Sequence, residues 1–297
     1  MDHSHVTAAA HCHGTVDTSF MALGAGKVAI LGVVQGISEL LPISSSAHMR
    51  AVPAFLGWPD PGAAFSAAMQ LAALAAVIVY FWRDLVAVTV GFFRAFATGS
   101  YRTPEFRLGA GIILATIPIV IAGTLLSNVL NRCGSPLRTP MVIGIACFVM
   151  ALLMGLAEII ARHTRKGDTL TYWDAILIGI AQVGALIPGV SRSGSTFTGA
   201  LFLGFEREQA ARISFLLGIP AIAAAGLKEI WELHKAGLSH EGWHILGIGL
   251  VVASISAFFA IWGLMRFLER ASTWPLVIYR ALFGLVVIAG AYYGWIA

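Results

Sequence analysis

Two apolar stretches of this 297-residue chain are long enough to enter a lipid bilayer, yet each is interrupted in its middle by a proline and several hydroxyl residues. The first, 28–56, contains LLPISSSAHMR, and the second, 173–204, contains LIPGVSRSGST. At membrane depth, non-helical backbone is tolerated only where protein or a water-filled cavity satisfies its N–H and C=O groups. The two breaks therefore predict a polar cavity within an otherwise apolar membrane protein.

The remainder of the sequence predicts membrane spans. Hydrophobic residues make up 58% of the chain and charged residues only 11%, whereas soluble proteins carry about 25% charged residues. A helix needs about 20 apolar residues to cross a hydrocarbon core. Runs of about this length predict six transmembrane helices, at 64–82, 108–130, 140–161, 207–226, 243–265 and 276–296. The expected fold class is an all-α polytopic membrane protein.

The two broken segments resemble each other. When residue 29 is placed over residue 175, AILGVVQGISELLPISSSAH lies over AILIGIAQVGALIPGVSRSG, with Ala-Ile-Leu, a Leu, the Pro and a Ser in common. Each half then holds one broken segment followed by three spans, and because three is odd the second half begins on the opposite side of the membrane. We expect an inverted repeat within a single membrane domain, 1–297: each half, 23–165 and 166–297, has one re-entrant helix-loop-helix plus three transmembrane helices. This plan brings the two breaks together.

The basic residues indicate an orientation. Loops 83–107 and 162–172 carry more Arg and Lys than the alternate loops, and the positive-inside rule places such loops in the cytoplasm. Both termini then lie outside. The basic residues are spread thinly over the loops rather than gathered into one patch, which argues against nucleic-acid binding.

Two groups of potential metal ligands lie outside this plan. Residues 1–22 form a His-rich tail with His3, His5, His11 and His13. A His-rich tract can bind metal, but we favour a disordered tail, and the stretch lacks the features of a cleavable signal peptide. The chain has three cysteines, Cys12, Cys133 and Cys147. Without a CxxC spacing they predict packing rather than a disulfide or zinc site.

The first break carries residues suited to chemistry. Gln35 and Glu39 are four residues apart and share one helix face. An ionisable group at the centre of a membrane helix costs about 2.5–3.5 kcal/mol, so Glu39 needs a role as proton acceptor, metal ligand or partner of Arg192, or as a purely structural ion pair. Ser45 and His48 are either a nucleophile and its base, or the imidazole itself attacks phosphorus. A histidine bonded to backbone is the structural alternative.

The residues of the second break predict a phosphate-binding site. Arg192 stands among hydroxyl residues and glycines: Ser191, Ser193, Ser195, Thr196, Gly189 and Gly194. The planar guanidinium fits phosphate bidentately, and glycines allow close approach of the backbone. Pro42 and Pro188 each end a half-helix, and a hydroxyl residue follows at the expected N-cap of the next. Two half-helix N-termini facing one cavity suggest a ligand with several negative charges.

These motifs carry a family resemblance. QGISELLPISSSAHM resembles the first signature of the undecaprenyl-diphosphate phosphatase family (BacA/UppP): a Glu or Gln, three residues, a Glu, then a Pro-x-Ser-Ser-x-x-His stretch. PGVSRSGST resembles the second, Pro-Gly-x-Ser-Arg-Ser with a Thr further on. The similarity continues through AAFSAAMQLAALAAVIVYFWRDL, ISFLLGIPAIAAAG and PLVIYRALFG, so it covers most of the chain.

The resemblance implies an enzyme of bacterial cell-wall synthesis, linked to bacitracin resistance, that hydrolyses a polyprenyl diphosphate to the monophosphate carrier. It implies catalytic roles for Glu39, Ser45, His48 and Arg192. It implies substrate binding by Gln35, Ser44, Ser191, Ser193 and Thr196. A divalent cation, Mg²⁺ or Ca²⁺, is expected on Glu39 and the diphosphate oxygens. Gln35 stands where the family often has a Glu, so this chain offers one carboxylate instead of two. Ser46-Ala47 stands where the family often has Thr-Gly.

The expected partners are the polyprenyl diphosphate, membrane lipid and a second copy of the chain in a homodimer, with no nucleic acid. The expected location is the bacterial inner membrane, with a multi-pass topology and an active site open to the periplasm. The alternative is a secondary transporter or flippase for a phosphorylated lipid, because inverted repeats with broken helices are also a transporter plan. The Ser45/His48 pair beside the anion site discriminates the two, since transport does not need it.

Overall fold

The structure is a computed structural model that describes residues 17–126 and 136–296. Within these ranges every regular element is a helix. The first half contains η1 (Ser19–Leu23), α1 (Gly24–Leu40), α2 (Ser45–Phe55), α3 (Ala63–Ala68), α4 (Gln70–Tyr80), α5 (Trp82–Thr98), α6 (Pro104–Leu125), η2 (Pro136–Arg138) and α8 (Pro140–Ile160). The second contains η3 (Gly167–Thr169), α9 (Tyr172–Val183), η4 (Gly184–Leu186), α10 (Arg192–Phe202), α11 (Arg207–Lys235), α12 (His240–Leu268) and α13 (Trp274–Tyr292).

Seven helical segments in the described ranges are long and apolar enough to cross a membrane. Six correspond to the predicted spans: Ala63–Tyr80, Pro104–Leu125, Pro140–Ile160, Arg207–Lys235, His240–Leu268 and Trp274–Tyr292. The seventh, Ser19–Leu40, contains α1, the first arm of the predicted re-entrant segment. The all-α polytopic fold is thus confirmed. The inverted symmetry of the two halves stays a prediction.

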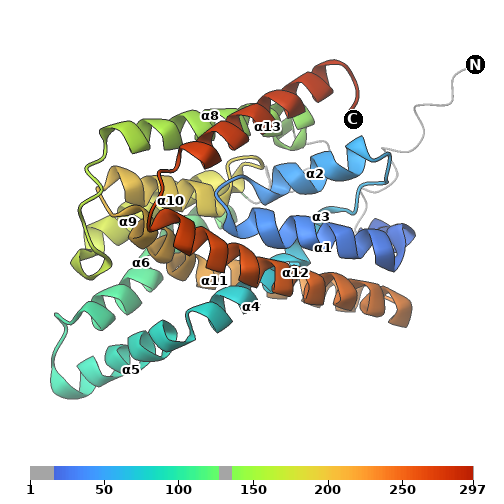
Figure 1. Ribbon diagram of the computed structural model, residues 1–297. Coiled ribbons are helices and arrows are strands. Elements are labelled where there is room, and N and C mark those ends of the chain that lie inside the picture. Colours follow the sequence, from blue (N-terminus) through green and yellow to red (C-terminus); the bar gives the residue numbers. More distant parts are fainter. Residues whose placement is uncertain (1–16, 127–135, 297) are drawn as a thin grey trace, which may run out of the picture.

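Both broken segments contain the predicted interruption. The chain leaves helical geometry between α1 and α2 and again between η4 and α10. In Figure 1, α1 and α2 extend from their break toward one end of the molecule, while α9 and α10 extend toward the other, and the two breaks meet between them. A hydrogen bond joins the two hairpins at their breaks, since the Gly189 N–H donates to Ser46 Oγ at 3.0 Å. Each broken segment therefore folds as a hairpin of two helices.

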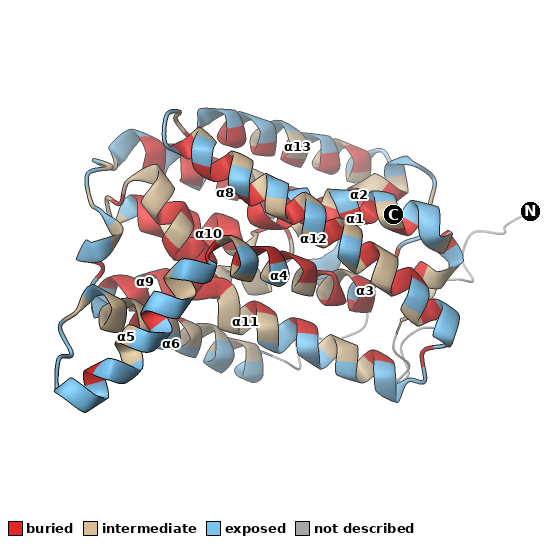
Figure 2. Cartoon of the chain, turned by 60° about the horizontal axis from the view of Figure 1, so that its bottom comes forward, coloured by how far each residue is buried: buried red, intermediate tan, exposed pale blue. Residues whose placement is uncertain are grey.

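The helices pack around these central hairpins. Figure 2 shows buried residues along α9, α10 and the inner faces of α1 and α8, with exposed faces on the outer helices. Many exposed side chains there are large and apolar, among them Ile113, Val251 and Phe259. Lipid chains are as apolar as leucine, so such faces suit contact with the bilayer. Close packing of α1 on α12 depends on Gly36, where a Cβ would lie 1.9 Å from Ser256 Oγ.

Two boundaries differ from those predicted. Residues 83–98, expected to belong to a cytoplasmic loop, lie in the amphipathic helix α5, Trp82–Thr98. Charged residues interrupt the apolar run in its sequence, so no run of span length marked it. Residues 19–22, assigned to the tail, lie in η1, where Phe20 is buried and stacks on Phe65 with ring centroids 5.1 Å apart.

The cysteine expectation is confirmed where the structure describes it, because Cys147 is free and fully buried. The other residues weighed for metal chemistry lie outside the described ranges: Cys12, Cys133, His3, His5, His11 and His13.

Candidate active site

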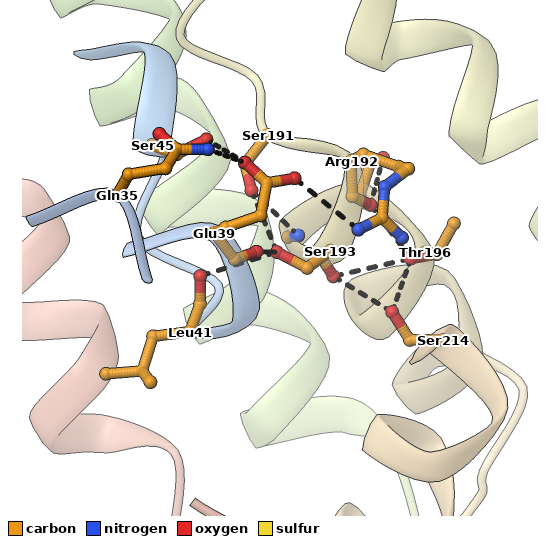
Figure 3. Close-up of polar contacts among 11 residues, drawn as sticks. Gln35, Glu39, Leu41, Ser45, Ser191, Arg192, Ser193, Thr196 and Ser214 are labelled. Atoms are coloured by element: carbon orange, nitrogen blue, oxygen red, sulfur yellow. Dashed lines mark hydrogen bonds and ion pairs between the residues drawn. The ribbon is translucent and has the colours of Figure 1, made fainter. Parts of the chain in front are cut away.

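The Glu39 carboxylate joins the two arms of the first hairpin. Gln35 Nε2, one turn earlier on α1, donates to Glu39 Oε2 at 3.0 Å. Ser45 Oγ, at the start of α2, donates to the same oxygen at 2.5 Å. Gln35 and Glu39 are both buried. The shared helix face predicted from their spacing is therefore present, and it faces the polar break (Figure 3).

Each half-helix begins immediately after a serine with positive φ. Ser44, the N-cap of α2, has φ 76°, and Ser191, the N-cap of α10, has φ 69°. Such values are uncommon outside glycine and cluster at functional sites. Ser191 Oγ accepts a bond from Gly194 N at 3.1 Å, which caps α10, whereas Ser44 Oγ makes no cap bond and lies 3.3 Å from Ser46 Oγ. The predicted N-cap positions are thus correct.

Arg192 is buried close to Glu39 without being satisfied. Its side chain is 10% exposed, and Nη2 lies 3.5 Å from Glu39 Oε1. Within the described part of the chain, its Nε, Nη1 and Nη2 atoms have no hydrogen-bond partner. The guanidinium lies against Gly218 of α11, where a Cβ would be 1.8 Å from Nη1. Because unsatisfied buried donors are costly, this arrangement suits a ligand rich in acceptor oxygens.

The hydroxyls of the second break mostly bond to the protein itself. Ser193 Oγ donates to the carbonyl oxygens of Glu39 at 2.9 Å and Leu41 at 3.3 Å, tying the start of α10 to the end of α1. Thr196 Oγ1 donates to Arg192 O at 2.8 Å and lies 2.5 Å from Ser214 Oγ of α11. Figure 3 shows this chain of contacts leading away from Glu39. Ser193 and Thr196, expected to bind substrate, here hold the two hairpins and α11 together.

His48 lies apart from these groups. Its Nδ1 lies 2.8 Å from the carbonyl oxygen of Ser44, and its Nε2 lies 2.8 Å from the hydroxyl of Tyr279 on α13. The ring also stacks on Phe283, with centroids 3.9 Å apart. With Nδ1–H donating to the carbonyl, Nε2 accepts from Tyr279, an assignment that follows from the hydrogen-bond pattern. The hydrogen bonds of His48 thus connect α2 to α13 and not to Glu39 or Arg192.

Arg280 is a site residue that the motifs did not single out. It is fully buried on α13. Its guanidinium donates to four backbone carbonyls, those of Pro42 at 2.7 Å, Gly189 at 2.9 Å, Val190 at 2.5 Å and Cys147 at 3.2 Å. One side chain therefore satisfies carbonyl groups of both breaks. A sequence signal was present, because an arginine inside an apolar span is by itself a functional hint.

The oxygen donors of the cluster fit a cation only in part. No group of three or more His, Cys, Asp or Glu that could hold a metal occurs among residues 17–126 and 136–296. Glu39 supplies a carboxylate with the hydroxyl of Ser45 beside it, while Gln35 turns its amide nitrogen to the same carboxylate oxygen. Mg²⁺ is commonly held by one or two carboxylates together with substrate phosphates. The donor set therefore fits a cation shared with a phosphorylated ligand, and not a cage of protein ligands.

These features define a polytopic membrane protein in which two broken helices meet around an arginine without hydrogen-bond partners in the described ranges and a buried glutamate. The chain belongs to the family described as bacitracin resistance protein BacA, whose profile matches residues 28–286. A protein of Mesorhizobium japonicum named undecaprenyl-diphosphatase 2 is 64% identical over 264 residues, which cover 89% of this chain and 100% of the relative. The undecaprenyl-diphosphatase of Gloeobacter violaceus is 50% identical over 90% of this chain and 91% of its own, and that of Trichormus variabilis is 47% identical over 87% and 81%. The family resemblance is confirmed.

Proposed function

We propose that this protein is a membrane phosphatase that hydrolyses undecaprenyl diphosphate to undecaprenyl monophosphate and inorganic phosphate, recycling the lipid carrier of cell-wall synthesis. The observation that carries the proposal is the buried Arg192 guanidinium, whose donors have no hydrogen-bond partner in the described ranges and lie beside Glu39 and Ser45. The names of the relatives support the same reaction. They do not favour the alternative, a transporter or flippase.

In this proposal Arg192 binds the terminal phosphate. A guanidinium forms two parallel charge-assisted bonds to phosphate, and Arg192 is also the first residue of α10, where free backbone N–H groups favour an anion. Donors already in place stabilise the charge that develops in the transition state. The substrate thus replaces the hydrogen bonds that the guanidinium lacks.

Ser45 is the nucleophile that the geometry favours. Its hydroxyl already donates to the Glu39 carboxylate, so Glu39 can take the proton as Ser45 Oγ bonds to the terminal phosphorus and undecaprenyl monophosphate departs with the bridging oxygen. Water then hydrolyses the phosphoserine. His48 stands second, because its two ring nitrogens are occupied by Ser44 and Tyr279. A trapped phosphoenzyme separates them, since phosphohistidine is labile in acid and phosphoserine is stable there.

A divalent cation, Mg²⁺ or Ca²⁺, belongs to the proposal. Glu39 would hold it, with Gln35 and Ser45 adjacent and the diphosphate completing the oxygen ligands. When bound, the cation would neutralise part of the diphosphate charge. Removal of divalent ions by EDTA is expected to stop phosphate release, and readdition of Mg²⁺ or Ca²⁺ to restore it.

The finer location and assembly are part of the same proposal. We place the protein in the bacterial inner membrane with its active site open to the periplasm and loops 83–107 and 162–172 in the cytoplasm, on the basis of their charge. Single cysteines introduced in these loops should react with a membrane-impermeant thiol reagent only after the cells are broken. A homodimer is the expected assembly, and chemical crosslinking in native membranes measures it.

The decisive experiment measures inorganic phosphate released from undecaprenyl diphosphate by the purified protein. Arg192→Ala and Glu39→Ala should each abolish release while the protein still elutes as a folded species. Arg94→Ala is the matched control, because Arg94 is exposed on α5. Near-normal turnover in either variant would contradict the assignment of the phosphatase site to Arg192 and Glu39.

A further inference from the structure

An apolar groove runs between α1, α12 and the start of α13. Its volume is about 820 Å³, and Ser256 is the one hydroxyl residue among the described residues that line it. It is lined by Val33 and Ile37 of α1 and by Leu41, the residue that directly follows this helix. Val33 and Ile37 are more than two-fifths exposed, so the groove opens outward from the bundle. Such a surface accepts hydrocarbon and has little to offer a polar ligand.

The inner end of the groove adjoins the polar break. Leu41 lines the groove, and its carbonyl oxygen accepts the hydrogen bond from Ser193. Leu264 of α12 also lines the groove, and it lies close to Ser193 and Ser214 in the interior of the bundle. Leu41 and Leu264 therefore border both the apolar groove and Ser193, the residue that follows Arg192 in the second break.

One face of helix α1 lies toward the polar break, and another face lines the apolar groove. Gln35 and Glu39 lie on the buried polar face, while Val33 and Ile37 lie on the face that lines the groove. Both faces end at the same break, the loop between α1 and α2 in Figure 1. A ligand with a charged head and an apolar tail has the same division, so its head fits the break and its tail fits the groove.

We propose that this groove binds the isoprene units nearest the diphosphate of the polyprenyl substrate. The inference rests on the proposed function and adds to it a binding site for the tail. A cavity of this size holds a ligand of drug-like dimensions, so the groove takes the first few units and leaves the remainder of a long chain in the bilayer. Recognition of the tail is then separate from recognition of the phosphates.

Two glycines of α12 provide a matched test. Gly263 lines the groove, and a Cβ there would meet no atom within 4 Å, so a side chain can grow into the groove without displacing backbone. Gly247 lies on the same helix outside the groove, and a Cβ there also meets nothing. Gly263→Trp should fill the groove and Gly247→Trp should not. Ala260→Leu, also in the groove, is a milder variant if the tryptophan prevents folding.

The experiment compares undecaprenyl diphosphate with dimethylallyl diphosphate, whose single isoprene unit can fill only a small part of the groove. For Gly263→Trp, kcat/KM on the long substrate should fall about tenfold or more, the range in which hydrophobic pockets discriminate by one methylene. Its kcat/KM on the short substrate should match wild type. Gly247→Trp should leave both values unchanged. Ala260→Leu should show the same selective loss to a smaller degree.

Two results overturn the proposal. Equal loss on both substrates means that the substitution disturbs the phosphate site, and no loss on either means that only membrane lipid fills the groove. If the wild-type protein hydrolyses neither diphosphate, it is the proposed function that fails. Native mass spectrometry then tests the groove alone, because undecaprenyl monophosphate should remain bound to wild type and Gly247→Trp and be lost from Gly263→Trp.

Discussion

Arg192 and Arg280 are two buried arginines beside the same pair of helix breaks, and they are bonded in opposite ways. Arg280 donates to four backbone carbonyls. Arg192 has one ion-pair contact at 3.5 Å and no hydrogen-bond partner for its nitrogen atoms within the described ranges. Identical chemistry therefore serves two purposes. The satisfied guanidinium holds the breaks together, and the unsatisfied one is available to a ligand.

Both arginines depend on a neighbouring glycine for their place. A Cβ at Gly194 would lie 2.3 Å from Arg280 Nη1, and a Cβ at Gly218 would lie 1.8 Å from Arg192 Nη1. The two arginines are thus both packed tightly and differ in their hydrogen bonds. This contrast predicts that the same substitution in the two residues affects different properties of the protein.

Replacement of Arg192 by methionine should produce the largest loss of activity. Methionine keeps an unbranched apolar stem but removes every donor, so the rate of phosphate release should fall by about 10²–10³-fold or more, as when a preorganised donor is removed from a transition-state site. Because the Arg192 guanidinium has no hydrogen-bond partner within the described ranges, the midpoint of thermal unfolding in detergent should stay near that of wild type. A large drop in that midpoint would show that Arg192 is structural as well.

Arg280→Met should instead lower stability. Four buried carbonyl oxygens would lose their donor, and an unsatisfied buried polar group costs about 1–3 kcal/mol. We expect the free energy of unfolding to fall by at least about 3 kcal/mol, measured by denaturation in mixed micelles, with activity lost only as the folded fraction falls. If Arg280→Met unfolds like wild type yet releases no phosphate, Arg280 acts on the substrate and the contrast fails.

Local patterns in the sequence predicted one side of this contrast. Proline and serine mark the breaks, a spacing of four places Gln35 and Glu39 on one face, and the setting of Arg192 indicates an anion site. Arg280 could be noticed as an arginine inside an apolar span, but its role and that of Gly218 depend on contacts with segments far away in the chain, which local patterns do not show. The direction in which His48 points depends on the rotation of α2 against α13, which the motif does not specify. Helix α5 was missed because charges interrupt the apolar run in its sequence.

Gly218→Ala tests whether the position of Arg192 matters. The added methyl group would lie 1.8 Å from Nη1 and must displace the guanidinium. Small misplacements of a binding group can cost about a hundredfold in rate, so kcat/KM for phosphate release should fall by about 10- to 100-fold. Gly247→Ala is the control, since its Cβ meets no neighbour. Equal kcat/KM values for the two variants would mean that activity does not require the space that Gly218 leaves for the Arg192 guanidinium.

Tyr279→Phe should have the smallest effect, and it sharpens the contrast by testing His48. The substitution removes the hydroxyl that bonds Nε2 but keeps the ring that lies next to Phe283. If Ser45 attacks phosphorus, the loss is one hydrogen bond between α2 and α13, worth about 0.5–1.5 kcal/mol of stability, and the pH profile of kcat should match wild type. A shifted profile would instead mean that the imidazole takes part in proton transfer. His48 would then belong with Arg192 among the groups that face the substrate, whereas an unchanged profile places it with Arg280 among those that hold the hairpins.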